Sequence, residues 1–372
     1  MPSKNLHEEP FDDCTITKLE IFEDYAQAWI PTFVMQKVPT ICIFDFFAGT
    51  GYDLKKIPGS PIRILKKIGD HIGHIYANGV QIKLYLNEYE PNKSKQQKFI
   101  KLKSACEEFL SDNKSVRGKV DIFYYNEDFE DLFPKLLPEI KQNPSLVYID
   151  QNGIKFLSDK YLLELEKMSQ TDFLYFASSS YIWRLGDTEE FKRHLAVDIE
   201  RLKSKPFKLI HRGLISELKE KLPSNTKLKL YPFSIKKGKN IFGIIFGATH
   251  PRAVDKFLDI AWKRNETNGQ ANFDMDEDSG KSQLDIFGGK KLTKIESFKE
   301  TLKSKILRKE ISNNFEALTF VHEEGHIGKH AADLLREMKK RGEITYTNNS
   351  PLVNYEKVYR KKIKLTYNVL SK

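Results

Sequence analysis

A short apolar run with an aspartate inside it ends at two glycines in the stretch ICIFDFFAGTGYD, over residues 41–53. The run ends at Ala48, Gly49 and Gly51, which is typical of a buried strand followed by a tight turn in a parallel α/β sheet. Glycine has no Cβ, so the backbone of such a turn can approach a ligand closely. Asp45 lies inside the apolar run, where an unpaired carboxylate is costly, and we expect it to meet a donor. The pattern predicts a nucleotide site at the end of this strand; the alternative is a tight turn without a ligand.

Further acidic residues follow the next predicted strands, which span residues 81–87, 119–125 and 145–150. An acid at the end of the second strand of a nucleotide-binding sheet can accept two hydrogen bonds from a ribose diol. Glu88 is better placed for this than Glu90, and the alternative for both is a solvent-facing acid at a strand end. Asp128 and Phe129 follow the third strand, where they could contact an adenine ring. Equally, Asp128 could begin the following helix, where negative charge is favourable.

Asp150 ends the fourth strand and is followed by Gln151, Asn152 and Gly153. If the sheet is parallel, Asp150 shares an edge with the glycine turn. This makes it a candidate for catalysis or for positioning a target.

The order of these elements predicts a Rossmann-like α/β sheet. A helix with apolar residues at helical spacing precedes the first strand, and we expect Pro31 to end it. The remaining predicted elements are a fifth strand over 172–177, two hairpin strands over 228–235 and 242–249, and a helix over 252–264.

The composition is that of a folded protein with a basic surface. The chain has 372 residues, 40% of them hydrophobic, and 61 Lys and Arg against 51 Asp and Glu, which gives a net charge of +10. This charge favours polyanionic partners such as nucleic acid. Three scattered cysteines, with no C-x-x-C pair, argue against a disulfide scaffold and a zinc ribbon. The sequence shows no signal peptide and no membrane-length apolar run, so we expect a soluble, cytoplasmic protein.

The C-terminal part has the outline of a winged helix. Two short helices precede a third over 329–341, and a strand starts at Ile344 after Gly342. In this fold the helix before the wing commonly enters the major groove of DNA. The residues predicted to contact phosphates are Lys329, His330, Arg336, Lys339, Lys340 and Arg341. The alternatives are a protein-docking module and a basic helix face that is merely solvated.

Three other motifs are disfavoured. A full NAD-type glycine fingerprint lacks its third glycine. Asp274, Asp276 and Asp278 alternate as in a calcium loop, but no glutamate closes the twelve-residue loop. The stretch HEEGH over 322–326 matches a zinc-protease motif, but Gly325 interrupts the helix that this motif requires.

Several segments together resemble the three-Cys-motif partner proteins (TcmP). They are KLEIFEDYAQAW from Lys18, DFFAGTG, YIDQNGIKFL from Tyr148 and, above all, FGIIFGATHPRAVDKFLDIAWKRNETNGQANFDM from Phe242. The pattern D-x-F-x-G-x-G also resembles the first motif of S-adenosylmethionine (SAM)-dependent methyltransferases. The resemblance implies a methyltransferase-like fold, a partner protein related to radical-SAM proteins, and a setting in mobile or antiviral operons. The cofactor would then be SAM, bound by Asp45, Phe46, Ala48, Gly49, Gly51, Glu88, Asp128 and Phe129.

The sequence departs from the family after the fourth strand. Members of the family usually have a pattern like D-P-x-G at this position. Amino-group methyltransferases have a polar residue followed by two prolines and an aromatic residue. The absence of such prolines after Asp150 disfavours amino-group methylation.

Two hypotheses follow from these patterns. The first is a SAM-dependent methyltransferase-like enzyme that acts on DNA or RNA, with Asp150 orienting the target. The second is a non-catalytic adaptor that binds a partner protein or nucleic acid. The expected parts are a leader and helix over 1–39, a methyltransferase-like domain over 40–268, a linker over 269–289 and a winged-helix-like domain over 290–372.

Overall fold

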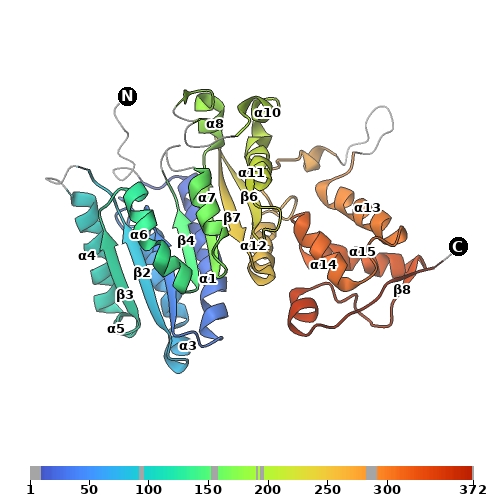
Figure 1. Cartoon of the computed structure of the whole chain (residues 1–372), viewed down its shortest axis with the longest axis horizontal. Helices are drawn as coiled ribbons and strands as arrows, with labels where there is room; N and C mark the ends of the chain where they lie inside the picture. Colours follow the sequence, from blue (N-terminus) through green and yellow to red (C-terminus); the bar gives the residue numbers. More distant parts are fainter. Residues whose placement is uncertain are drawn as a thin grey trace. The chain divides into compact units, whose positions relative to one another are not determined.

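The computed structural model describes residues 10–91, 96–151, 158–189, 192, 197–281 and 291–370. The chain divides into two compact units, Met1–His250 and Pro251–Lys372. Figure 1 shows the elements of both units along the chain.

The first unit is built on one sheet, which has seven strands in the part of the chain that the structure describes. Their order is β3-β2-β1-β4-β5-β7-β6. Strands β1 to β5 run parallel, and β7 pairs antiparallel with both β5 and β6. The bounds are β1 Thr40–Asp45, β2 Gln81–Asn87, β3 Val120–Tyr125, β4 Ser145–Ile149, β5 Thr171–Ala177, β6 Lys229–Lys237 and β7 Asn240–Ala248. The predicted Rossmann-like sheet with an antiparallel hairpin at its edge, as in the methyltransferase fold, is confirmed.

Helices cover both faces of this sheet (Figure 1). They are α1 Asp13–Val34, α2 Ser60–Asp70, α3 Ile72–Ala77, α4 Gln97–Asp112, α5 Lys114–Arg117, α6 Phe129–Gln142, α7 Asp159–Glu166, α8 Ser179–Leu185, α10 Ile199–Lys203 and α11 Ile210–Lys221, with a short 3₁₀ turn at Phe207–Leu209. Every residue of β4 and β5 is buried. Strands covered on both faces are expected to be largely apolar, and the sequences of β4 and β5 agree with this.

The expectation that Pro31 ends the first helix is wrong. Helix α1 continues through Pro31 to Val34. A proline inside a helix has no N–H for the carbonyl four residues earlier, which here is the carbonyl of Gln27. The His71 ring lies with Nε2 3.2 Å from that Gln27 oxygen. A side chain from a later element therefore supplies the hydrogen bond that the proline cannot.

The second unit packs helices and a small antiparallel ladder around its own core. Its elements are α12 Pro251–Arg264, a 3₁₀ turn at Asp278–Gly280, α13 Lys294–Leu307, α14 Asn314–Glu323, α15 Gly328–Lys340, β8 Ile344–Thr345, a π-helical turn at Glu356–Arg360 and β9 Asn368–Val369. Strand β8 pairs with β9, so a long segment rather than a short turn joins the two strands of the wing. The buried Asn314 side chain bonds to Leu352, Ile363 and Leu365 and holds this segment against α14.

The division between the units falls before α12, whereas the sequence suggested a linker over 269–289. Trp262 on α12 explains the difference. Its ring N–H donates to the Gly325 carbonyl at 2.9 Å, and the ring lies against His326 and His330. Helix α12 therefore packs against the C-terminal helices through Trp262. None of the helices within the described residues is long and apolar enough to cross a membrane.

Candidate site at the carboxyl edge of the sheet

The turn after β1 has the backbone geometry that its glycines allow. Gly49 and Gly51 adopt φ of +68° and +87°, a region that favours glycine. A Cβ on Gly51 would lie 2.7 Å from the Cβ of Ala105 on α4, so the turn and that helix are in close contact. The Gly51 carbonyl accepts the N–H of Gly59 at 2.8 Å. The turn is therefore held from two sides.

Asp45 is buried and meets two neutral donors, as expected from its place in an apolar run. Its carboxylate accepts the Ser60 hydroxyl at 2.5 Å and the Phe47 N–H at 3.1 Å. Burial raises the pKa of Asp45 to about 7, and the two hydrogen bonds only partly offset this. The carboxyl group thus changes its charge near neutral pH.

Glu88 reaches from the end of β2 to the glycine turn. Its Oε2 accepts the N–H of Gly49 at 2.8 Å. The side chain is buried, which raises the pKa of Glu88 to about 6. Glu90 instead holds the start of α4, because its Oε2 accepts the N–H groups of Lys98 and Phe99 there. The structure brings Glu88, and not Glu90, onto the turn.

Sequence reasoning missed Asn87, the last residue of β2. Its buried amide donates to the carbonyls of Phe46 and Glu127 and accepts the Glu127 N–H at 3.1 Å. One side chain therefore ties together the ends of β1, β2 and β3. Its place directly before Glu88 was the only signal in the sequence, and nothing there distinguishes it from an ordinary loop asparagine.

Asp128 is the N-cap of α6, because its side chain accepts the N–H of Glu130 at 2.9 Å. The helix-start alternative thus describes its bonding. Phe129 is 1% exposed and packs edge to face against Phe46 at 5.1 Å and Tyr161 at 4.8 Å. Ala48 is buried as well. A contact of Asp128 or Phe129 with a ligand remains a prediction.

Asp150, after β4, is paired with a lysine that lies 132 residues earlier in the chain. Both oxygens lie within reach of Lys18 Nζ on α1, at 2.6 and 2.8 Å. Tyr148 also donates to Asp150 at 3.3 Å, and the lysine ammonium lies 4.0 Å from the ring centre of Phe176. Lys18 was missed because only the packing of α1 against the sheet brings it there.

Gln151, the next residue, is buried and donates to the carbonyl of Phe176 at 3.2 Å. Asn152 and Gly153, on which the departure from the family pattern depended, lie outside the described residues.

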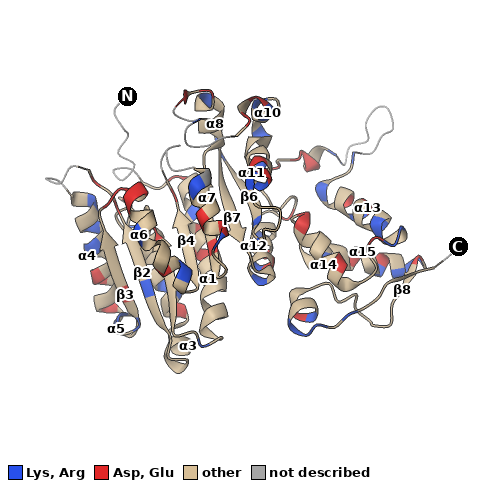
Figure 2. Cartoon of the chain, in the orientation of Figure 1, with Lys and Arg blue, Asp and Glu red and all other residues tan. Residues whose placement is uncertain are grey.

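The basic residues predicted to contact phosphates differ in their surroundings. Lys329, Lys340 and Arg341 are exposed, and Arg336 pairs with Asp333 at 2.8 Å. Lys339 donates to the carbonyls of Tyr346 and Asn348 and so holds the segment after β8. His330 is buried, with its Nδ1 3.0 Å from that of His326. Figure 2 shows Lys and Arg distributed over both units.

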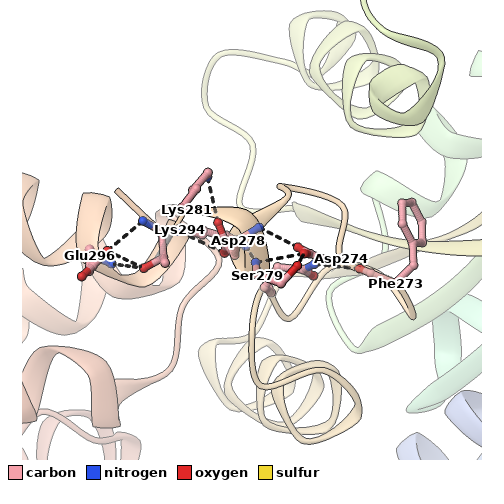
Figure 3. A network of polar contacts seen from close by, with 9 residues as sticks. Phe273, Asp274, Asp278, Ser279, Lys281, Lys294 and Glu296 are labelled. Atoms are coloured by element: carbon pink, nitrogen blue, oxygen red, sulfur yellow. Dashed lines mark hydrogen bonds and ion pairs between the residues drawn. The ribbon is translucent and has the colours of Figure 1, made fainter. Parts of the chain in front are cut away.

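Neither metal motif has the geometry of a metal site. Asp274 accepts the N–H groups of Asp278 and Ser279, and Asp278 pairs with Lys281 at 2.8 Å (Figure 3). These acids therefore bond to protein donors. Helix α14 ends at Glu323 and Gly325 has φ of +69°, so a turn separates the two histidines of the HEEGH stretch. In the described part of the chain, no three His, Cys, Asp or Glu side chains could hold a metal ion together.

Comparisons with known proteins support the architecture of the second unit. Residues 263–351 match the family model of the GMT-like wHTH domain, a winged helix-turn-helix. No curated protein matches the chain.

The similar solved structures are distant. A "putative O-methyltransferase" from Klebsiella pneumoniae is 12% identical with a TM-score of 0.32, covering 64% of this chain and 90% of its own. The O-methyltransferase TomG from Streptomyces achromogenes, solved with SAM, is 9% identical with a TM-score of 0.33, covering 66% and 92%. Likenesses of this size do not establish a function, and the fold assignment rests on the strand order.

Proposed function

We propose that the first unit is a SAM-dependent methyltransferase and that the winged helix-turn-helix unit helps it bind DNA or RNA. The observation that carries this proposal is the contact between Glu88 and Gly49 at the carboxyl edge of the sheet. Open α/β sheets bind ligands outside the carboxyl ends of their strands, where a glycine turn admits the ligand and an acid accepts hydrogen bonds from a ribose. The GMT-like wHTH match supports the nucleic-acid part.

The residues of this edge have separate roles in the proposal. Gly49 and Gly51 let the backbone approach the ligand, and Asp45 holds the turn through Ser60. The Glu88 carboxylate accepts hydrogen bonds from a ribose diol, and Asp128 lies on the adenine side. SAM supplies a methyl group on a sulfonium. The protein contributes mainly by holding the target in line with that group, with Asp150 next to it.

Calorimetric titration tests this proposal most directly. Purified protein is titrated with SAM, with its demethylated product and with ATP, and the titrations are repeated on Gly49→Arg. Gly79→Arg is the matched control, because Gly79 also has positive φ and has open space around it. Gly79 lies before β2, at the amino ends of the parallel strands and away from the glycine turn. We expect micromolar SAM binding that is lost in Gly49→Arg and kept in Gly79→Arg. No binding of SAM, or equal binding by all three proteins, would contradict the proposal.

A non-catalytic adaptor is the second candidate, and the pairing of Asp150 with Lys18 favours it. A carboxylate that already binds a lysine through both oxygens, and accepts the Tyr148 hydroxyl as well, has less acceptor capacity left for a target. A labelled-methyl transfer assay on DNA and RNA separates the two functions. Transfer excludes the adaptor. SAM binding without transfer, together with recovery of a three-Cys-motif protein in a pull-down, would favour it.

A further inference from the structure

A small pocket at the end of β5 has no part in the site described so far. It has a volume of about 290 Å³, and its lining residues are Ser180, Trp183, Arg184, Phe207 and Asn240. Trp183 lies on α8, which follows β5, and Asn240 begins β7. Strand β7 runs antiparallel to β5, pairing Ala177 with Gly243, so its first residue lies at the carboxyl edge of β5. The pocket therefore opens on the same edge of the sheet as the glycine turn.

We propose that this pocket binds one nucleobase of a single-stranded nucleic acid. The inference rests on the proposed function, because it names the substrate class and the place where the target lies. In strand order, Asp150 after β4 lies between the glycine turn after β1 and the pocket after β5. A target held there would lie on the opposite side of Asp150 from Glu88.

The pocket has two aromatic walls. Trp183 is 39% exposed, whereas the other two tryptophans, Trp29 and Trp262, are 2% and 3% exposed. The Phe207 ring meets Trp183 edge to face, with ring centres 5.7 Å apart and an interplanar angle of 79°. Lys203 Nζ lies 6.0 Å from the Trp183 ring centre, and a flat ring can stack against the exposed part of the indole. A pocket near the lower end of the usual ligand range, about 300–1,000 Å³, suits a group of that size.

The polar residues around the indole suit the rest of a nucleotide. Asn240 offers a donor and an acceptor, the pair that a base edge requires. Arg184 lies over Tyr181 with its guanidinium carbon 5.3 Å from the ring centre, and its Nε bonds to the Ser180 carbonyl. A guanidinium fixed in this way next to a stacking surface suits a phosphate. Bases stacked on aromatic rings beside basic side chains are the usual mode of single-strand binding.

The charge of the surroundings also favours an anion. The turn between β6 and β7 is basic, with Lys236, Lys237 and Lys239 directly before Asn240. Lys237 pairs with Asp12, and Lys203, near Trp183, pairs with Asp187. Arg184 lines the pocket and the basic turn directly precedes Asn240, so basic side chains lie close to the pocket.

The pocket walls are fixed to the sheet. The buried Ser180 hydroxyl donates to the Ile241 carbonyl at 3.2 Å and accepts the Ile241 N–H at 3.0 Å. These two bonds hold the start of α8 against the start of β7 and so set Trp183 beside Asn240. The site is therefore formed before any ligand arrives, which lowers the entropic cost of binding.

Tryptophan fluorescence of the full chain tests the inference, because Trp183 is the exposed one of the three tryptophans. We expect a short single-stranded oligonucleotide, oligo(dT) or oligo(U), to change the emission and to protect the indole from iodide quenching. Trp183→Phe should lose this signal but keep the affinity. Trp183→Ala should weaken oligonucleotide binding, measured by anisotropy, about tenfold, in line with stacking of one base.

Tyr76→Ala is the matched control. Tyr76 is also exposed, at 49%, and lies beside a lysine, with Lys119 Nζ 5.0 Å from its ring centre. It belongs to α3, which precedes β2 and so lies toward the other edge of the sheet. We expect this variant to bind like the wild type. Retained SAM binding or an unchanged circular dichroism spectrum shows that Trp183→Ala is folded.

Two results would overturn the inference. One is oligonucleotide binding that leaves the Trp183 emission unchanged and is equally strong in Trp183→Ala, which would place the binding elsewhere, such as on the winged helix-turn-helix. The other is no binding of either oligonucleotide. SAM binding without oligonucleotide binding would refute this inference alone, whereas a Trp183-dependent oligonucleotide signal without SAM binding would refute the methyltransferase proposal and support the pocket.

Discussion

The carboxylate at the end of β1 bonds to neutral donors, whereas the carboxylate after β4 bonds to a cation. Asp45 accepts a hydroxyl and an N–H, and Glu88 accepts the N–H of Gly49. Asp150 is paired with Lys18. Neutral donors only partly replace the solvation of a charge, so burial raises the pKa of Asp45 and of Glu88.

The difference indicates how each part of the edge can respond to a ligand. The pKa values of Asp45 and Glu88, about 7 and about 6, lie near neutral pH. A ligand that donates hydrogen bonds can therefore favour the charged form of these two acids. The charge of Asp150, after β4, is already balanced by Lys18 within a largely buried pair. Such a pair is costly to break, because the partner left behind is a buried and uncompensated charge.

The largest expected effect on the free energy of unfolding comes from breaking the ion pair between Lys18 and Asp150. Lys18→Met should lower the free energy of unfolding by roughly 3–5 kcal/mol, because it leaves Asp150 without a cation. Urea unfolding at pH 7 measures this. Lys67→Met, which removes a more exposed lysine from its pairs with Glu23 and Asp70, should cost less than about 1 kcal/mol. In the double variant Lys18→Met/Asp150→Asn the loss should be smaller than the sum of the single losses; simple additivity would show that the pair is not coupled.

Asp45 should make the stability depend on pH. Its pKa in the folded state, about 7, lies above its ordinary value of 3.8, so the folded state holds the proton more tightly. The stability present at low pH is therefore lost as the pH rises from about 4 to about 7, by about 1.4 kcal/mol per unit of pKa difference. Asp45→Asn keeps the shape without the charge, so its urea midpoint should fall less across this range. Parallel curves for the two proteins would contradict the assignment.

The glycine turn can be tested by adding a single methyl group. Gly51→Ala should lower the free energy of unfolding by roughly 2–3 kcal/mol, because it combines positive φ with a close approach to Ala105. Gly79→Ala shares the positive φ but meets nothing within 4 Å, and should cost about 1 kcal/mol. Thermal unfolding compares the two, and equal losses would mean that contact with α4 does not constrain the turn.

The smallest expected effect concerns Glu88 and the proposed cofactor. A ribose diol donates to the charged carboxylate, so SAM affinity should rise as the pH increases through about 6, the pKa of Glu88. Glu88→Gln should bind SAM about tenfold more weakly and without this pH dependence, since a hydrogen bond to a charged group contributes roughly 1.5–3 kcal/mol. Glu90→Gln, altered at the helix start, serves as the control. Unchanged binding by Glu88→Gln would remove Glu88 from the site.

The positions of the strands along the chain and the turn after β1 could be predicted from the sequence because both depend on local patterns. Continuous apolar runs specify strands covered on both faces, as β4 and β5 are. Small residues at Gly49 and Gly51 specify a turn with positive φ. An acid before a helix specifies an N-cap, and Asp128 has that role.

The tertiary structure alone decided which side chains meet. Lys18 and Asp150 are 132 residues apart, and no local pattern pairs them. Likewise, only packing buries His330 against Trp262 and lets His71 bond to the carbonyl that Pro31 leaves without a partner in the helix. Local sequence determines backbone conformation and burial on average. The partner of a given charge or carbonyl depends on which elements the fold places beside it.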